Sequence, residues 1–238
     1  MLIIAMAPAL EQTKTLLREA AEGYAPSVLA SSLGVEDMVL LDLIASLKAP
    51  IAVFTLDTGR LPQETYDLLQ LARARYGVPI DLFAPENADI ERYSAAHGPN
   101  GFYESVALRQ ECCHLRKVKP LRRALAGKKS WVTGLRRGQS AGRSAIAAKE
   151  WDAEHQLEKF NPLADWSEQE VWDYVREHDV PVNALHAQGY PSIGCAPCTR
   201  AIAPGEDLRA GRWWWENPEF SECGLHPRSE RHDKAHGP

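Results

Sequence analysis

Apolar positions in the N-terminal half of the chain follow two alternating patterns. Some stretches repeat every three to four residues, which is typical of an amphipathic helix, and others are short continuous apolar runs, which are typical of buried strands. The pattern predicts helices at 13–23, 36–47, 62–76 and about 112–126, and strands at Ser27–Leu33, Ile51–Leu56, Ile80–Phe83 and Trp131–Thr133. Pro62 suits the first turn of the third helix, and Gly77 suits its end.

Strands that alternate with helices predict a parallel sheet, because right-handed crossovers place the helices on its faces. The predicted fold class is therefore α/β, a doubly wound parallel sheet with helices on both faces. Ligands of such sheets bind outside the carboxyl ends of the strands, so the loops after Leu33, Leu56 and Thr133 are expected to converge on one site. We expect a single domain over residues 1–200 and a flexible C-terminal segment over residues 201–238.

A further helix is predicted from a capping signal in the second half of the chain. Ser167 and Glu170 have the spacing of a capping box, and the residues that follow have an amphipathic pattern. Trp166, Trp172 and Val175 are interpreted as core residues of this region.

Composition and charge narrow the function classes. The chain has 238 residues, of which 45% are hydrophobic and 25% charged, with a net charge of -5, which argues against a sequence-independent nucleic-acid binder. No apolar run approaches the roughly 20 residues that a membrane span needs. The N-terminus lacks the positive region of a secretory signal, and five cysteines are too few for a secreted disulfide scaffold. The expected location is the cytoplasm.

Four of the five cysteines form two pairs, Cys112 with Cys113 and Cys195 with Cys198. Zinc is the metal ion that four cysteines usually bind, but two adjacent cysteines fit poorly around one metal atom. A four-iron four-sulfur (4Fe-4S) cluster offers each thiolate a separate iron, so one 4Fe-4S cluster is the preferred interpretation. The alternative is that Cys112 and Cys113 are buried helix residues and that Cys195 and Cys198 form a separate redox pair.

Cys223 is the remaining cysteine, in a stretch poor in aliphatic residues. A lone exposed thiol is a candidate nucleophile, provided that cations or His226 favour its thiolate. A surface cysteine without a role is the alternative.

Positive charge is concentrated around the first cysteine pair. Residues 109–143 include eleven Lys or Arg and a single acid, Glu111. A solvated basic face is the usual meaning of such a run, but here it overlaps two predicted sheet-edge loops, which favours an anion site. Lys117 lies one helical turn beyond Cys113, and further guanidinium groups suited to phosphate or sulfate come from Arg136, Arg137, Arg143, Arg209 and Arg212.

The loops that follow the strands supply small and polar residues. The loop Ser31–Asp37 joins a strand to a helix, where hydroxyls and backbone amides can hold a phosphate. Nucleotide contacts are expected from Ser31, Ser32, Gly34, Leu56, Asp57, Thr58, Gly59, Gly134 and Arg136.

Four motifs together resemble the assimilatory adenylylsulfate (APS) reductases of the iron–sulfur type, within the phosphoadenylylsulfate (PAPS) reductase family. They are Glu-Cys-Cys-His-Leu-Arg-Lys at 111–117, Ile-Gly-Cys-Ala-Pro-Cys-Thr-Arg at 193–200, Gly-Arg-Trp-Trp-Trp-Glu at 211–216 and Glu-Cys-Gly-Leu-His at 222–226. Weaker support comes from Leu-Asp-Thr-Gly-Arg at 56–60 and Lys-Phe-Asn-Pro-Leu at 159–163.

This resemblance implies the reduction of APS to sulfite and AMP, with electrons from thioredoxin or a similar dithiol protein. Cys223 would form an S-sulfocysteine intermediate, Lys117, Arg209 and Arg212 would hold the phosphosulfate, and His226 would lie near the substrate. The two cysteine pairs would hold a cluster that passes no electrons but keeps Lys117 in place. No nucleic-acid or membrane partner is implied, and a homo-oligomer is compatible with the sequence.

The fold also resembles the ATP-pyrophosphatase superfamily, whose folds are of the adenine nucleotide alpha hydrolase type. Leu33 stands where that superfamily has a glycine, which fits a ligand that releases no pyrophosphate. The alternatives are a PAPS reductase or an enzyme with dual APS and PAPS use, an ATP-dependent thiolation enzyme with an iron–sulfur centre, and a non-catalytic, zinc-stabilised nucleotide sensor.

Overall fold

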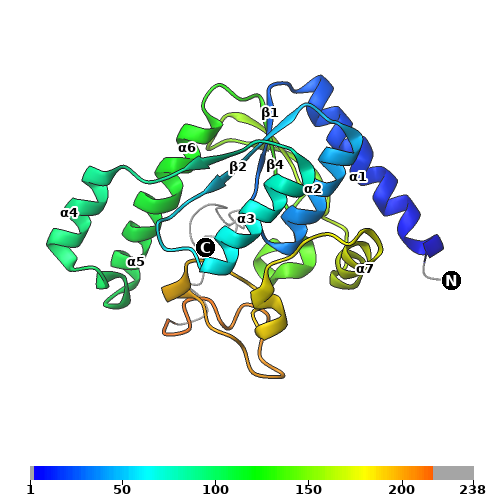
Figure 1. Ribbon diagram of the computed structural model, residues 1–238. Helices are drawn as coiled ribbons and strands as arrows, with labels where there is room; N and C mark the ends of the chain where they lie inside the picture. The colour runs from blue at the N-terminus through cyan, green and yellow to red at the C-terminus, as the bar shows by residue number, and fades with distance from the viewer. Residues whose placement is uncertain (1–2, 217–238) are drawn as a thin grey trace, which may run out of the picture.

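The computed structural model describes residues 3–216 and contains a six-stranded sheet (Figure 1). The strand order is β3-β2-β1-β4-β6-β5. The strands are β1 (Ser27–Ala30), β2 (Ile51–Leu56), β3 (Ile80–Phe83), β4 (Ser130–Val132), β5 (Lys149–Asp152) and β6 (Leu157–Phe160). β1, β2, β3, β4 and β6 are parallel, and β5 pairs antiparallel with β6 at the edge.

The direction of winding reverses at β1. The chain adds β2 and β3 on one side of β1 and then places β4 on the other side. A crevice at the carboxyl ends of the strands is expected at such a reversal, so β1 and β4 mark the binding site of the fold. The predicted doubly wound α/β class is confirmed.

Successive strand residues face two separate cores, because side chains alternate across a sheet. Leu29, Val53 and Val132 lie in the larger core, with α1 (Ile3–Gly23), α2 (Val35–Leu47), α3 (Gln63–Tyr76) and α7 (Glu168–His178). Val28 and Trp131 face the other side, where they contact α6 (Lys119–Leu125). Because both faces of these strands are buried, their sequences are continuous apolar runs.

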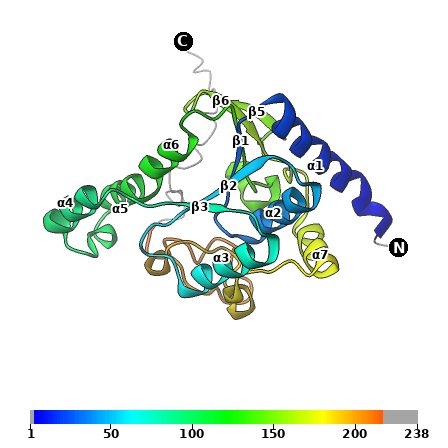
Figure 2. The same ribbon diagram turned by 45° about the horizontal axis from the view of Figure 1, so that its top comes forward.

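The predicted helix at about 112–126 is part of a longer, irregular helical segment. It consists of α5 (Val106–Cys113), a π-helical turn at His114–Val118 and α6. Together with α4 (Asn87–His97), α5 projects from the sheet on the side opposite α1, as both views show (Figure 2). A π-helical turn has more residues per turn than an α-helix, so Lys117 is not simply stacked above Cys113.

The predicted capping box is confirmed at the start of α7. The Ser167 hydroxyl accepts a hydrogen bond from the Glu170 amide, and the Glu170 carboxylate accepts one from the Ser167 amide. Trp166 and Val175 are buried as predicted, while Trp172 is only partly buried. Across residues 3–216, the helices are too short or too polar to cross a membrane.

Candidate active site

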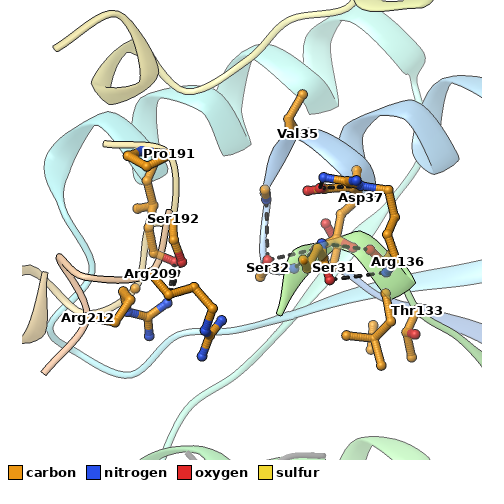
Figure 3. A pocket seen from close by; sticks show the side chains of 18 of the residues that line it. Ser31, Ser32, Val35, Asp37, Thr133, Arg136, Pro191, Ser192, Arg209 and Arg212 are labelled. Atoms are coloured by element: carbon orange, nitrogen blue, oxygen red, sulfur yellow. Dashed lines mark hydrogen bonds and ion pairs between the residues drawn. The ribbon is translucent and has the colours of Figure 1, made fainter. Parts of the chain in front are cut away.

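The main cavity of the structure lies at the carboxyl ends of the central strands and has a volume of about 510 Å³. The three strand-end loops predicted to converge do so, and Figure 3 shows Ser31, Ser32, Thr133 and Arg136 at the cavity. Ser31, Ser32 and Gly34 follow β1, Leu56 ends β2 and Thr58 follows it, and Thr133, Gly134 and Arg136 follow β4. A volume of this size suits a small organic ligand such as a nucleotide.

Two carboxylates, those of Glu36 and Asp37, lie in the first turn of α2, on one side of this cavity. One Asp37 oxygen accepts hydrogen bonds from the Ser32 amide at 2.6 Å and from the Ser32 hydroxyl at 2.7 Å. Burial raises the pKa of Asp37 to about 6, although both bonds from Ser32 favour the carboxylate. A Cβ on Gly134 would lie 2.3 Å from Asp37 Oδ1, so glycine is required for the loop after β4 to approach α2.

Arg136 and Glu36 form an ion pair on the same side of the cavity. Arg136 Nε lies 2.9 Å and Nη2 lies 2.8 Å from Glu36 Oε1. The guanidinium also donates to the Trp166 carbonyl, and both side chains are largely buried. Arg136 therefore lines the cavity as predicted, but its charge is balanced by a residue one hundred positions earlier in the chain.

Lys117, Arg209 and Arg212 give the opposite side of the cavity a positive charge. Figure 3 shows Arg209 and Arg212 beside Pro191 and Ser192, facing Ser32 and Asp37 across the cavity. Arg212 Nη1 donates to the Ser192 hydroxyl and the Ile193 carbonyl, at 3.3 and 3.2 Å. A Cβ on Gly194 would lie 2.3 Å from Arg212 Nη2, so this glycine makes room for the guanidinium.

The loop after β2 divides into lining residues and residues that stabilise its turn. Leu56 and Thr58 line the cavity, whereas Asp57 and Gly59 do not. Asp57 Oδ1 accepts hydrogen bonds from the Gly59 amide at 2.8 Å and from the Tyr66 hydroxyl at 2.7 Å, and Gly59 has a positive φ of 67°. Asp57 and Gly59 therefore shape this loop, and their predicted contact with a nucleotide stays a prediction.

The two cysteine pairs meet beside the positive side of the cavity. Cys112 and Cys113 end α5, and Cys195 and Cys198 flank the short turn Ala196–Cys198. All four are buried and form no disulfide, and three of them share one apolar cluster with Trp213. The thiol of Cys195 donates to the Thr58 hydroxyl at 3.3 Å, which ties this pair to the loop after β2.

Cations surround the thiols and offset the cost of burying them. Burial favours the neutral thiol of Cys195, but Lys117, the Thr58 hydroxyl and Arg212 together lower its pKa. Burial and the neighbouring Cys195 and Cys113 instead raise the pKa of Cys198 to about 12. Lys117 is therefore close enough to Cys195 to affect its ionisation.

The four thiols are candidate ligands of a metal group. Within residues 3–216, no three His, Cys, Asp or Glu side chains are grouped as the ligands of one metal ion would be. Thiolates that bind a metal group carry negative charge, which neighbouring cations stabilise. Cys112 interacts with Arg116 and Arg60, and Cys113 interacts with Arg109, so such cations are present.

A buried ion pair attaches the chain after the second cysteine pair to α5. Arg109 Nε and Nη2 lie 3.0 and 2.8 Å from the two carboxylate oxygens of Glu216. The Arg109 guanidinium also lies over the Trp213 ring, 4.9 Å from its centroid. Residues up to 216 therefore pack onto the body of the protein, although they belong to the predicted C-terminal segment.

Two predicted site residues, Cys223 and His226, lie outside the described residues. Conversely, the loop before Cys195 was not predicted to line the cavity, although Ile193 and Gly194 belong to a quoted motif. Its lining residues are His186, Gly189, Pro191, Ser192, Ile193 and Gly194. The signal in the sequence was the pair of glycines, Gly189 and Gly194. Trp131 and Trp172 also line the cavity, although their aromatic character suggested the core alone.

Comparisons with known proteins show the family of the chain. Residues 26–201 match the family model described as "Phosphoadenosine phosphosulfate reductase domain". An "Adenosine 5'-phosphosulfate reductase" of Allochromatium vinosum is 59% identical over 211 residues, covering 88% of this chain and 82% of the relative. An "Adenosine 5'-phosphosulfate reductase" of Burkholderia cepacia is 53% identical over 221 residues, covering 93% of this chain and 88% of the relative.

A solved structure of phosphoadenylyl-sulfate reductase from Candida auris, in a phosphate complex, matches with a TM-score of 0.69 and 27% identity, covering 84% of this chain and 96% of that one. The structure of FMN adenylyltransferase from Candida glabrata matches with a TM-score of 0.59, covering 96% of this chain and 80% of that one. At 15% identity, this match shows a shared fold alone. Since the family model spans most of the chain and includes both cysteine pairs, the protein belongs to the phosphoadenosine phosphosulfate reductase family.

Proposed function

We propose that this protein reduces adenylyl sulfate (APS) to sulfite and AMP in the assimilation of sulfate. The observation that carries the proposal is the positive side of the cavity, which Lys117, Arg209 and Arg212 line and where Lys117 and Arg212 lie close to the buried Cys195 thiol. The names of the curated relatives support the same substrate.

The charge of the substrate fits this side of the cavity. APS has one charge on its phosphate and one on its sulfate, and an ammonium and two guanidiniums are suited to bind these oxygens by charge-assisted hydrogen bonds. The purine suits the apolar part of the lining, which includes Phe54, Leu121 and Trp131. The phosphosulfate then lies at the positive side, with its sulfate near the cysteine centre.

Cys223 is the proposed nucleophile, on the strength of the motif at 222–226. Its thiolate attacks the sulfate sulfur, the bond from that sulfur to the bridging oxygen breaks, and AMP leaves with the electron pair. The product is an S-sulfocysteine. A thiolate of thioredoxin, or of a similar dithiol protein, attacks Sγ of Cys223 and releases sulfite, and its second thiol resolves the mixed disulfide.

Cys112, Cys113, Cys195 and Cys198 are the proposed ligands of one 4Fe-4S cluster. When bound, such a cluster supplies electrostatic influence on the neighbouring anion site and no electrons. Lys117 lies between the cavity and Cys195, so its ammonium is positioned by the same residues that would hold the cluster. We propose a cytoplasmic location, where thiols stay reduced.

The proposal is tested by incubating the anaerobically purified protein with APS, with and without a thioredoxin system. Without reductant, Cys223 should gain the mass of one SO₃ group, and with reductant sulfite should accumulate. Cys223→Ser should keep the metal and bind AMP, yet form no adduct. An adduct on another residue, or sulfite produced by the serine variant, would contradict the mechanism, and turnover of neither APS nor PAPS would contradict the function.

Lys117→Ala should weaken the use of APS more than it weakens the binding of AMP. The ammonium is assigned to the phosphosulfate, and a charge-assisted hydrogen bond contributes about 1.5–3 kcal/mol, so kcat/KM should fall about 10- to 100-fold. The matched control is Lys119→Ala, which removes a partly exposed lysine paired with Asp89. Equal losses for APS and AMP would show that Lys117 is structural.

Cys195→Ser should remove the metal centre. Four-cysteine ligation of a 4Fe-4S cluster predicts broad visible absorption and about four irons per chain in the unaltered protein. Cys195→Ser should lose the visible absorption and the iron, whereas Cys223→Ser should keep them. Stoichiometric zinc without iron after anaerobic preparation would show that the cluster assignment is wrong.

A further inference from the structure

The charged groups that line the cavity are divided unequally between its two sides. Lys117, Arg209 and Arg212 form the cationic side. Asp37 and Arg136 lie on the opposite side (Figure 3), where Glu36 pairs with Arg136, and these three residues form the carboxylate side. Glu168 and Arg143 also line the cavity. Counting each as ionised, the cationic side sums to +3 and the carboxylate side to -1.

Glu36 neutralises the guanidinium of Arg136 on the carboxylate side. Arg136 is only 5% exposed, and two of its nitrogens lie within 2.9 Å of one Glu36 oxygen. Its third nitrogen donates to the Trp166 carbonyl. The Arg143 guanidinium donates to Gln139, which in turn accepts from the Arg136 amide.

The start of α2 is also occupied by the chain's own groups. A helix N-terminus attracts phosphate through its amides and its dipole, but Glu36 and Asp37 place two carboxylates in the first turn here. Asp37 accepts the Ser32 amide and hydroxyl, and Ser32 Oγ accepts the Gly34 amide at 3.3 Å. The Ser32 amide, the Ser32 hydroxyl and the Gly34 amide are therefore already bonded within the loop.

We propose that Glu36 is a specificity-determining residue, which restricts the site to adenylyl sulfates whose ribose carries no additional phosphate. The inference rests on the proposed function, because that function places the phosphosulfate at the cationic side. The ribose then lies toward the carboxylate side, where carboxylates can accept hydrogen bonds from its hydroxyls. A phosphate on that ribose would lie against the carboxylate side, whose net charge is negative. Like charges at a binding interface are strongly unfavourable.

The proposal makes a direct prediction for Glu36→Gln. The amide removes one negative charge and leaves the charge of Arg136 unbalanced and positive. The ratio of kcat/KM for PAPS to that for APS should therefore rise about tenfold or more, as should the relative affinity for adenosine 3′,5′-bisphosphate over AMP.

Three matched variants separate this role from a general charge effect. Glu168→Gln removes the same charge from the lining without touching the Arg136 ion pair, so the PAPS-to-APS ratio should stay within about twofold. Glu36→Asp keeps the charge and should keep the preference for APS. The double variant Glu36→Gln with Arg136→Gln should lose most of the gain, because the released guanidinium is its source.

The outcomes distinguish failure of the inference from failure of the proposed function. Turnover of neither nucleotide by the unaltered protein would contradict the function itself. Turnover of APS with an unchanged ratio in Glu36→Gln, or an equal gain in Glu168→Gln, would overturn the inference alone. Binding by the unaltered protein gives a test that needs no variant, because equal affinities for AMP and adenosine 3′,5′-bisphosphate would also overturn it.

Discussion

The close approach of four buried thiols is the constraint on which the site depends. Two of them end α5 and two lie on the turn at residues 195–198, so the chain must bring the loop 186–198 under the carboxyl ends of the strands. The Ala196 amide donates to the Arg60 carbonyl at 2.8 Å, and Thr58 accepts from the Cys195 thiol. These bonds fix the cysteine loop against the end of β2. The same arrangement positions Lys117 and Arg212 at the cavity.

The buried guanidiniums of Arg109 and Arg136 each have a carboxylate partner. Arg109 is fully buried and is paired with Glu216, stacked on Trp213 and in contact with Cys113. An unpaired guanidinium at this depth would be strongly unfavourable, so the cysteine centre and the chain at residue 216 are energetically coupled. On the other side of the cavity, Glu36 balances Arg136 in the same manner. Charge pairing thus determines where the site is positive and where it is not.

The sequence predicted the sheet well because its strands are buried on both faces and therefore apolar. It missed the β5–β6 pair, since an edge hairpin with sequence Lys149–Asp152 has no apolar run. The union of the two cysteine pairs was predictable from residue type and spacing. The balance of Arg136 by Glu36 was not, because an ion pair between residues one hundred positions apart leaves no local signal. The hydrogen bonds by which Asp57 stabilises its turn, from the Gly59 amide and the Tyr66 hydroxyl, were likewise not predicted.

The central claim is that the two sides of the cavity orient the nucleotide by charge. A crystal structure of the protein with bound AMP, grown anaerobically, tests this claim most directly. We predict that the phosphorus atom lies beside Lys117, Arg209 or Arg212, with the ribose hydroxyls toward Glu36. A phosphate bound at Ser32 and Gly34 on the start of α2, with the ribose at the cationic side, would contradict it.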